Sequence, residues 1–500
     1  MSTGPLLFRA DASTQMGTGH VMRCLALAQA WQDEGGEVVF ASAEITKAIE
    51  DRLREENVKL ITLPVTAGTA KDVDLTSAAA RECGAKWIVV DGYQFHAAYQ
   101  RSLQQAGLKV LYVDDNGHLE QYWADLVLNQ NAHAAEDLYK NREQKTRLLL
   151  GPRYALLRRE FNNWRGWKRD TPRVAREVLL TMGGSDPENV TKWILQLLRE
   201  MEIEGLEITV VLGGSNQHRV SVDEAAAPAG TILKTNVSSM SELMASADVA
   251  IAGAGTTTWE LCFMGVPALL IELADNQARV ASQMQTLGVA RSLRKTKRSK
   301  SSFFSLFKEL IESRETRSRM AEKGRALVDG YGASRVCSFL DGAVRLRRAE
   351  AKDSRMIWNW ANDPLTRAVS FSSNPISWER HVKWFESQLA DSNAMFYVAI
   401  DANAAPLGQV RFNVDNGRGT VSIGLGSEHR GKGLGGKVLD QAVEEVFQTG
   451  RVRQLDAYVK ADNPASLRLF ERAGFREVGK ERVKDVDAIH FLLSRTEPLA

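Results

Sequence analysis

The segment DVAIAGAGTTTWE, residues 248–260, contains the strand, the turn and the helix start that define one unit of a parallel α/β sheet. Residues 248–252 form a mainly apolar run, two glycines follow it, and threonines 256–258 begin a helical pattern. Short apolar runs are typical of strands that are covered by helices on both faces, and glycine lets the chain turn sharply from strand into helix. The segment therefore predicts a buried parallel strand that leads directly into a helix.

Similar units recur before and after this segment. The sequence Gly-Gly-Ser follows two further apolar runs, at Gly183 and at Gly213. Repeats of strand, glycine turn and helix indicate a nucleotide-binding type of sheet. Its strands are expected at Glu177–Thr181, Glu207–Leu212, Thr231–Leu233, Asp248–Ala252 and Ala268–Ile271.

The first 130 residues also alternate short apolar runs with helical patterns, and they predict another parallel sheet. Two such sheets facing each other create a deep cleft, which is typical of the two-lobed GT-B-like glycosyltransferase fold. We expect the lobes to cover residues 1–160 and 161–342. The strands of the first lobe are expected at Leu6–Ala10, Glu37–Ala41, Lys86–Val90, Lys109–Val113 and Leu126–Leu128.

The pattern changes around residue 344. Hairpin-like strands are expected at Met395–Ile400 and Gly408–Val414, and the turn at residues 415–417 leads into a third strand at Thr420–Leu425. Residues 344–500 therefore predict a separate α+β domain. The fold class is α/β, with a pair of Rossmann-type lobes followed by this α+β domain.

Composition limits the classes of partner. The 64 basic and 62 acidic residues nearly balance, so no nucleic-acid partner is expected. The basic stretch Arg291–Lys300 is interpreted as a solvated surface loop, with a phosphate contact as the alternative. The four cysteines form no CxxC pair, so neither a disulfide framework nor a metal site is predicted. No apolar stretch approaches the roughly 20 residues of a membrane span, and we expect a cytoplasmic enzyme whose oligomeric state the sequence leaves open.

A first candidate site begins at the turn Gly17-Thr18-Gly19-His20, which precedes a predicted helix at residues 21–31. Glycines allow close approach of a ligand to the backbone, and an imidazole can take a proton from water at neutral pH. The alternative is that His20 only caps or packs against the helix. Asp11 and Asp91 each follow a predicted strand, so they either line the cleft or cap the next helix.

The opening segment contributes a second part of this site. Gly253, Gly255, Thr256 and Thr257 suit a diphosphate, because the first amides of a helix and its dipole favour anions. Glu260 would repel a diphosphate but could accept hydrogen bonds from two ribose hydroxyls beside it. This division fits a uridine diphosphate sugar, and the alternative is a glycine turn needed only for packing.

At these residues the chain resembles the UDP-sugar hydrolases of pseudaminic acid biosynthesis, over about residues 4–340. The resemblance implies that His20 positions or deprotonates the attacking water, that Asn276 lies beside the sugar diphosphate, and that the substrate is a UDP-activated amino sugar. It also brings Tyr93 and Gly184 into the candidate site. The motifs that carry it are FRADAS, GTGHVMR, VVDGY at 89–93, VDDNG at 113–117, LNQN at 128–131, GGSDP at 183–187, AGAGTTTWE and ADNQ at 274–277.

A second candidate site lies in the third domain. The turn RGKGLGG precedes a predicted helix at residues 437–447, and its consecutive amides suit a pyrophosphate. A second motif, NPASLRLFERAGF at residues 463–475, follows about thirty residues later. The candidate residues of the turn that would bind this ligand are Arg430, Gly431, Lys432, Gly433, Leu434, Gly435 and Gly436.

This pair of motifs resembles the GNAT N-acetyltransferases, over roughly residues 344–497. The resemblance implies acetyl-coenzyme A as co-substrate, with the pantetheine arm near Leu425 and Asn463 close to the cofactor. Phe470 stands where many members have a tyrosine that protonates the leaving thiolate, so the general acid stays open between Tyr458 and other groups. His429 is either an amine base or an exposed loop residue.

Together the two resemblances predict a bifunctional enzyme that acetylates a UDP-4-amino sugar and then hydrolyses its UDP linkage. Two alternatives remain: a UDP-sugar glycosyltransferase fused to an amino-sugar acetyltransferase, and a first half that binds nucleotide sugars without catalysis.

Overall fold

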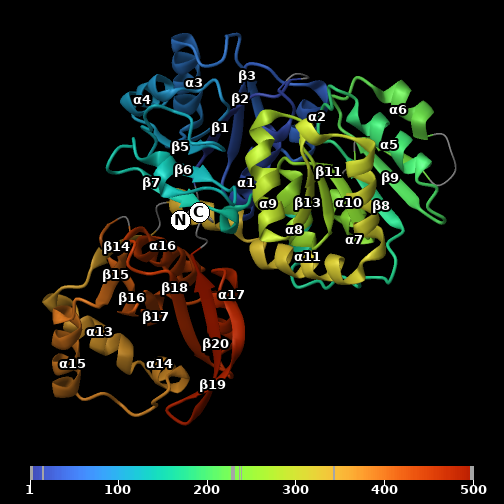
Figure 1. Cartoon of the computed structure of the whole chain (residues 1–500). Helices are drawn as coiled ribbons and strands as arrows, with labels where there is room; N and C mark the ends of the chain where they lie inside the picture. Colours follow the sequence, from blue (N-terminus) through green and yellow to red (C-terminus); the bar gives the residue numbers. More distant parts are fainter. Residues whose placement is uncertain are drawn as a thin grey trace. The chain divides into compact units, whose positions relative to one another are not determined.

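A computed structural model describes residues 4–13, 16–226, 231–235, 237, 239–341, 344–401 and 403–495. The chain divides into two compact units, Met1–Ser334 and Arg335–Glu497. The predicted boundary falls at residues 342–343, which lie outside the described residues. Figure 1 shows the chain coloured from blue at the N-terminus to red at the C-terminus.

The first lobe of the first unit is built on a seven-stranded parallel sheet of order β3-β2-β1-β4-β5-β6-β7. All five predicted strands are present. Its strands are β1 (Leu6–Ala10), β2 (Val38–Ser42), β3 (Lys59–Thr62), β4 (Trp87–Asp91), β5 (Lys109–Val113), β6 (Leu126–Asn129) and β7 (Arg147–Leu150). Its helices are α1 (Gly19–Asp33), α2 (Lys47–Glu55), α3 (Ala70–Cys83) and α4 (Ala97–Gln105).

The second lobe is built on a six-stranded parallel sheet of order β10-β9-β8-β11-β12-β13. Its strands are β8 (Glu177–Thr181), β9 (Glu207–Leu212), β10 (Thr231–Thr235), β11 (Val249–Gly253), β12 (Ala268–Ile271) and β13 (Ala290–Leu293). Its helices are α5 (Val190–Glu200), α6 (Arg219–Ala226), α7 (Met240–Ser246), α8 (Thr257–Met264), α9 (Ala278–Leu287), α10 (Lys300–Glu312) and α11 (Arg314–Leu327).

The apolar runs predicted as buried strands are covered on both faces. Along β11, Val249 and Ile251 belong to one hydrophobic cluster, whereas Ala250 and Ala252 belong to another. Alternate side chains of a strand point to opposite faces, so helices must cover both sides of this sheet. This pattern is that of a doubly wound Rossmann-type sheet.

The second unit contains a seven-stranded sheet of order β14-β15-β16-β17-β18-β20-β19. Helix α12 (Gly332–Leu340) precedes the sheet. The strands of the sheet are β14 (Arg345–Arg348), β15 (Ala394–Ile400), β16 (Pro406–Asp415), β17 (Arg418–Leu425), β18 (Gln454–Lys460), β19 (Arg476–Val483) and β20 (Val486–Ser494). Its other helices are α13 (Ser354–Asn362), α14 (Pro364–Val369), α15 (Trp378–Ala390), α16 (Leu434–Gln448) and α17 (Pro464–Arg472).

One pairing in this sheet is incomplete. Strands β17 and β18 are parallel and pair only from Arg418 to Thr420, opposite Gln454 to Asp456. The rest of β17 pairs with β16 on its other side, as far as Leu425. The two strands therefore diverge beyond Thr420 and leave backbone groups of β17 available along one edge.

The four cysteines, all within the described residues, form no disulfide bond, and Cys24, Cys262 and Cys337 are buried. Among the residues that the structure describes, none of the helices has both the length and the apolar character needed to cross a bilayer.

Candidate active sites

A cluster of charged side chains lies where β4 and β5 end. Arg23, one turn into α1, donates two hydrogen bonds to Asp91, at 2.6 and 2.7 Å, and a third to Asp115 at 2.7 Å. Burial alone would raise the pKa of Asp115, but the Arg23 guanidinium outweighs it and holds that pKa well below its usual range. Asp115 is therefore ionised, and it shares the buried Arg23 cation with Asp91.

Tyr93 connects this cluster to both lobes. Its hydroxyl donates to Asp115 Oδ2 at 3.1 Å and accepts from Asn276 Nδ2 at 3.1 Å. Its ring meets the His20 ring edge-on, with centroids 5.2 Å apart. Burial raises the pKa of Tyr93 to about 12, so its hydroxyl stays protonated. The structure thus brings together His20, Tyr93 and Asn276, which are far apart along the chain.

The carboxylates of Asp11 and Asp91 are hydrogen-bonded to other residues of the first lobe. Asp11 Oδ1 accepts from Arg9 at 2.7 Å and from the amide of Ala43 at 2.7 Å, and Gln94 donates to Oδ2 at 2.9 Å. Asp91 is fully buried against Arg23. Because both carboxylates already have internal partners, the geometry favours a positioning role for them over direct contact with substrate.

The predicted glycine turns of the two lobes meet. Gly17 has a φ of +80°, a conformation that favours glycine. A Cβ on Gly184 would lie 2.5 Å from Thr18 Oγ1, so a larger residue there would push the lobes apart. Gly184 therefore serves close packing of these turns.

The start of α8 has the features of an anion site. Within the described part of the chain, the amides of Thr256 and Thr257 donate no hydrogen bond, and Thr256 provides no side-chain cap. Gly253 and Gly255 lie just before them, and the buried Thr258 Oγ1 also has no partner among the described residues. These groups converge on the helix N-terminus, where negative charge is favoured.

Glu260 lies one turn further along α8 and pairs with Arg158, which the sequence reasoning did not single out. Arg158 donates to Glu260 Oε1 at 2.9 Å and also contacts Glu160 at 2.8 Å. Burial raises the pKa of Glu260 despite this cation. One Glu260 oxygen is thus engaged, and its partner comes from a connecting segment with no motif that could have revealed it.

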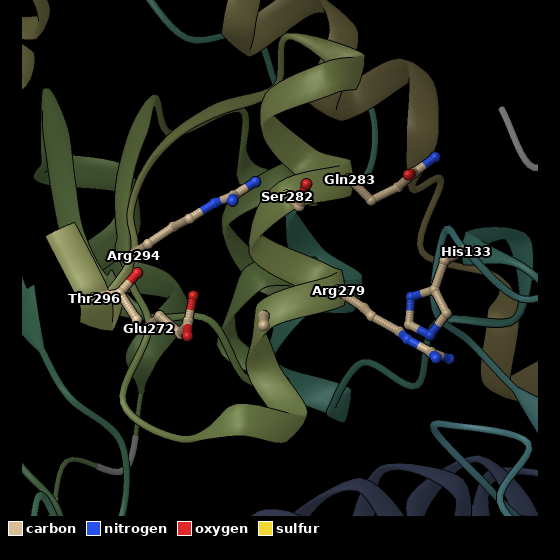
Figure 2. Close-up of a pocket in the computed structure, with 8 residues that line it drawn as sticks. His133, Glu272, Arg279, Ser282, Gln283, Arg294 and Thr296 are labelled. Atoms are coloured by element: carbon tan, nitrogen blue, oxygen red, sulfur yellow. The ribbon is translucent and has the colours of Figure 1, made fainter. Parts of the chain in front are cut away.

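A pocket of about 420 Å³ is lined by residues of both lobes (Figure 2). His133, from the loop after β6, lines it together with side chains of the second lobe. His133 is joined to the polar cluster, since its Nε2 lies 2.9 Å from the Asp115 carbonyl oxygen. The pocket was not predicted, and its other lining residues are Glu272, Ala278, Arg279, Ser282, Gln283, Arg294 and Thr296.

In the second unit, the predicted cofactor turn follows the diverging end of β17. Gly431 and Gly433 both have a φ of +73°, and α16 begins at Leu434 without a side-chain cap. Lys432 is exposed on this turn, and Gly436 is open to added volume. A Cβ on Gly435 would only make ordinary contact with Leu469 and Leu425. The turn therefore presents backbone amides at a helix start beside Leu425.

Arg430 has a different environment from the one expected. It donates to Asp363 Oδ1 at 2.7 Å and to Thr366 Oγ1 at 2.7 Å, and its Nε lies 3.3 Å from the Leu425 carbonyl oxygen. The hydrogen bond between Arg430 and Asp363 lowers the pKa of Asp363. Arg430 thus ties the turn to the start of α14, and its charge is already matched.

The remaining predicted residues have identifiable contacts. Asn463 caps α17 by accepting from the Ser466 amide at 3.2 Å. Phe470 is buried and stacks on Phe491. Tyr458 stacks on His490, with centroids 4.7 Å apart, on the face of β18 opposite the main hydrophobic cluster. The His429 Nε2 lies 3.2 Å from Glu428 Oε1.

Comparison with known families agrees with this division. Residues 178–330 match the glycosyltransferase family 28 C-terminal domain, and residues 343–476 match the acetyltransferase (GNAT) domain. The putative phosphinothricin acetyltransferase YwnH of Bacillus subtilis is 31% identical over 143 residues, which cover 27% of this chain and 86% of that protein. The chain belongs to the GNAT acetyltransferases through this domain. The predicted fold class is confirmed: two Rossmann-like lobes, the second of glycosyltransferase 28 type, precede a GNAT domain.

Two further relatives extend the comparison. An uncharacterized protein of Methanocaldococcus jannaschii is 23% identical over 498 residues, covering 94% of this chain and 96% of that protein. The UDP-2,4-diacetamido-2,4,6-trideoxy-beta-L-altropyranose hydrolase of Campylobacter jejuni is 26% identical over 213 residues, covering 42% and 70%. The first unit is therefore a module related to sugar-nucleotide enzymes, fused to a GNAT domain.

Solved structures similar to the GNAT domain include the aminoglycoside acetyltransferase AAC(6')-Ib with paromomycin and acetyl-coenzyme A. It is 22% identical, covers 31% of this chain and 94% of that chain, and aligns with a TM-score of 0.28. The described residues contain no cluster of three or more His, Cys, Asp or Glu side chains suited to a metal ion.

Proposed function

We propose that the chain catalyses two consecutive reactions on a UDP-linked amino sugar. The GNAT domain acetylates the 4-amino group of UDP-4-amino-4,6-dideoxy-N-acetyl-β-L-altrosamine, with acetyl-coenzyme A as co-substrate. The first unit then hydrolyses the resulting UDP-2,4-diacetamido-2,4,6-trideoxy-β-L-altropyranose to UDP and the free sugar. One chain carrying both sites raises the local concentration of the intermediate.

The acetyl-transfer step rests on the divergence of β17 and β18. Free backbone groups on β17 suit the amides of a pantetheine arm, and the amides after Gly431 and Gly433 suit the pyrophosphate. The acceptor amine attacks the thioester carbon directly and gives up a proton, the C–S bond breaks, and the leaving thiolate takes up one proton in exchange. Phe470 has no hydroxyl to supply that proton, and Tyr458 faces the side of β18 away from the main hydrophobic cluster.

The hydrolysis step rests on the contact between His20, Tyr93 and Asn276, which is the observation that carries this half of the proposal. His20 takes a proton from water as the water attacks the anomeric carbon, with inversion, and the bond to the diphosphate breaks. The open amides of Thr256 and Thr257 receive the diphosphate charge. Glu260 accepts from the ribose through the oxygen that Arg158 does not hold.

Product analysis tests both reactions in order. The full chain is incubated with acetyl-coenzyme A and the UDP-4-amino sugar, and mass spectrometry follows the products over time. We expect acetylated UDP-sugar to appear first and then to give way to free 2,4-diacetamido sugar and UDP. Acetylation without UDP release would overturn the hydrolase assignment. A glycoside that forms only with an added acceptor would show a glycosyltransferase instead.

Replacing Gly433 with valine is expected to weaken acetyl-coenzyme A binding about 100-fold. A branched residue at this φ stores about 1–3 kcal/mol of strain, and relief of that strain reorients the amides that face the pyrophosphate. Gly417→Val is the matched control, because Gly417 has a φ of +79° and equally open surroundings in a hairpin turn. Calorimetric titration should show unchanged binding for Gly417→Val. Equal weakening in both variants would contradict the assignment of the turn.

A further inference from the structure

The pocket in Figure 2 carries more positive charge than its neighbours neutralise. Most basic side chains of the segment 291–300 form ion pairs with acidic residues. The pairs are Arg291 with Glu309, Lys295 and Arg298 with Glu188, and Lys300 with Glu200. Arg294 has no acidic partner among the described residues, and it points over α9 toward Ser282. The basic segment, which was predicted as a solvated surface loop, therefore consists mostly of paired side chains, and Arg294 lines a pocket.

A second guanidinium lines the same pocket without an acidic partner in the described chain. Arg279, in the first turn of α9, extends to the ring of His133. Two exposed arginines on one pocket repel each other unless an anion lies between or beside them, and arginine binds phosphate and carboxylate with two parallel hydrogen bonds. The pocket therefore favours an oxyanion.

His133 adds a requirement of another kind. Burial lowers its pKa, and the charge of Arg279 lowers it further, so the ring is neutral. Its Nε2 lies 2.9 Å from the Asp115 carbonyl oxygen, which can only accept, so the proton is on Nε2. Its Nδ1 is a buried acceptor with no partner in the described structure. A ligand that satisfies Nδ1 must bring a donor such as a hydroxyl.

The Glu272 carboxylate likewise favours a ligand that donates hydrogen bonds. The carboxylate lines the pocket beside Thr296 although the residue is only 7% exposed, and it repels a bare anion. A ligand that carries hydroxyls as well as an oxyanion satisfies Glu272, Thr296 and His133 Nδ1 while its charge meets the arginines. Inorganic phosphate offers fewer hydroxyl donors to these three groups than a sugar phosphate does.

We infer that this pocket is a binding site for a sugar that carries an oxyanion, either a phosphate or a carboxylate. The site adjoins the polar cluster, because His133 contacts the backbone of Asp115, whose carboxylate accepts from Tyr93. It is distinct from the amides at the start of α8 that the proposed reaction assigns to the diphosphate. The inference requires neither proposed reaction, although its test uses UDP to fill the nucleotide site that the proposed function assigns to α8.

Calorimetric titrations of the full chain with glucose 1-phosphate, glucuronate and glucose test the site. Saturating UDP is present throughout, so that binding at α8 does not contribute. We expect at least one anionic sugar to bind and glucose to bind at least tenfold more weakly, because glucose lacks the charged group that the two arginines would hydrogen-bond. The tighter of the two anionic sugars identifies the oxyanion as phosphate or carboxylate.

Variants locate the binding. Arg279→Gln and Arg294→Gln should each weaken the anionic sugar about tenfold, whereas Lys297→Gln, on the same basic segment but outside the pocket lining, should not. Unchanged binding in both arginine variants would overturn the inference. Inorganic phosphate binding as tightly as glucose 1-phosphate would overturn the requirement for a sugar. Circular dichroism confirms that each variant is folded.

Discussion

Replacing His20 with glutamine is expected to slow UDP release about 10²–10⁴-fold, the usual contribution of a general base. Glutamine can still hydrogen-bond a water molecule, but it cannot take up the proton. The His20 side chain lies at the start of α1 and is only partly buried, so the variant should keep its fold and its affinity for UDP. Initial rates of UDP release and calorimetric titration with UDP separate the two effects.

His118→Gln is the matched control, because it removes the other histidine beside Tyr93. The His118 ring meets the Tyr93 ring edge-on at 5.7 Å, and its Nδ1 lies 3.3 Å from Asp114. The hydrogen bond with Asp114 raises the pKa of His118, so a larger fraction of this ring already carries the proton and cannot accept another. We expect less than about a tenfold effect on turnover. Equal losses in both variants would contradict the role of His20 as the base, and acetyl transfer should be unchanged in either.

Apolar periodicity predicted the central strands because these strands are buried on both faces and carry few polar residues. In the two parallel sheets it missed β3, β7 and β13, each of which is an edge strand. Their sequences KLIT, RLLL and ARSL are four residues long and mix charged with apolar residues. Such short segments cannot be distinguished from loops by pattern alone.

The candidate site was predictable to the extent that parallel strands end at one edge of a sheet. That rule placed polar residues after β4 and β5 in one cleft, and the structure joins His20, Tyr93 and Asn276 there. It could not show that Arg23 neutralises Asp91 and Asp115, since those pairings join residues 68 and 92 positions apart. The one available signal was a charged residue among apolar neighbours in α1, which implies a buried partner.

The role of Arg430 was not visible in the sequence for a similar reason. A basic residue before a glycine turn suggests a phosphate contact, and only the three-dimensional structure brings Asp363 within 2.7 Å of it. Spacing therefore identified the backbone of the turn correctly as a helix start, whereas side-chain partners depended on contacts across the domain.

Replacing Arg23 with methionine is expected to lower the free energy of unfolding of the first unit by about 3–5 kcal/mol. The exposed fraction of the Arg23 side chain is 4%, and its removal leaves Asp91, whose side chain is fully buried, without its cation. Methionine fills a similar volume, so the loss reflects unpaired charge more than a cavity. Urea unfolding followed by tryptophan fluorescence measures it, and Arg23→Lys, which keeps the charge but not the paired hydrogen bonds, should lose less.

The pH dependence of the free energy of unfolding gives a sharper test, because the contribution of Asp115 is expected to have opposite signs in the variant and in the parent chain. In the parent the pKa of Asp115 lies below its unfolded value of about 3.9, so its stabilisation is complete above that pH and is lost only in acid. Without Arg23, desolvation raises the pKa of Asp115 in the folded state above the unfolded value. Arg23→Met should therefore gain stability as the pH falls from about 8 to 5, by about 1.4 kcal/mol per unit of pKa difference. A variant that loses stability over this range would show that Arg23 does not neutralise Asp115, and that the charged cluster is held together by other contacts.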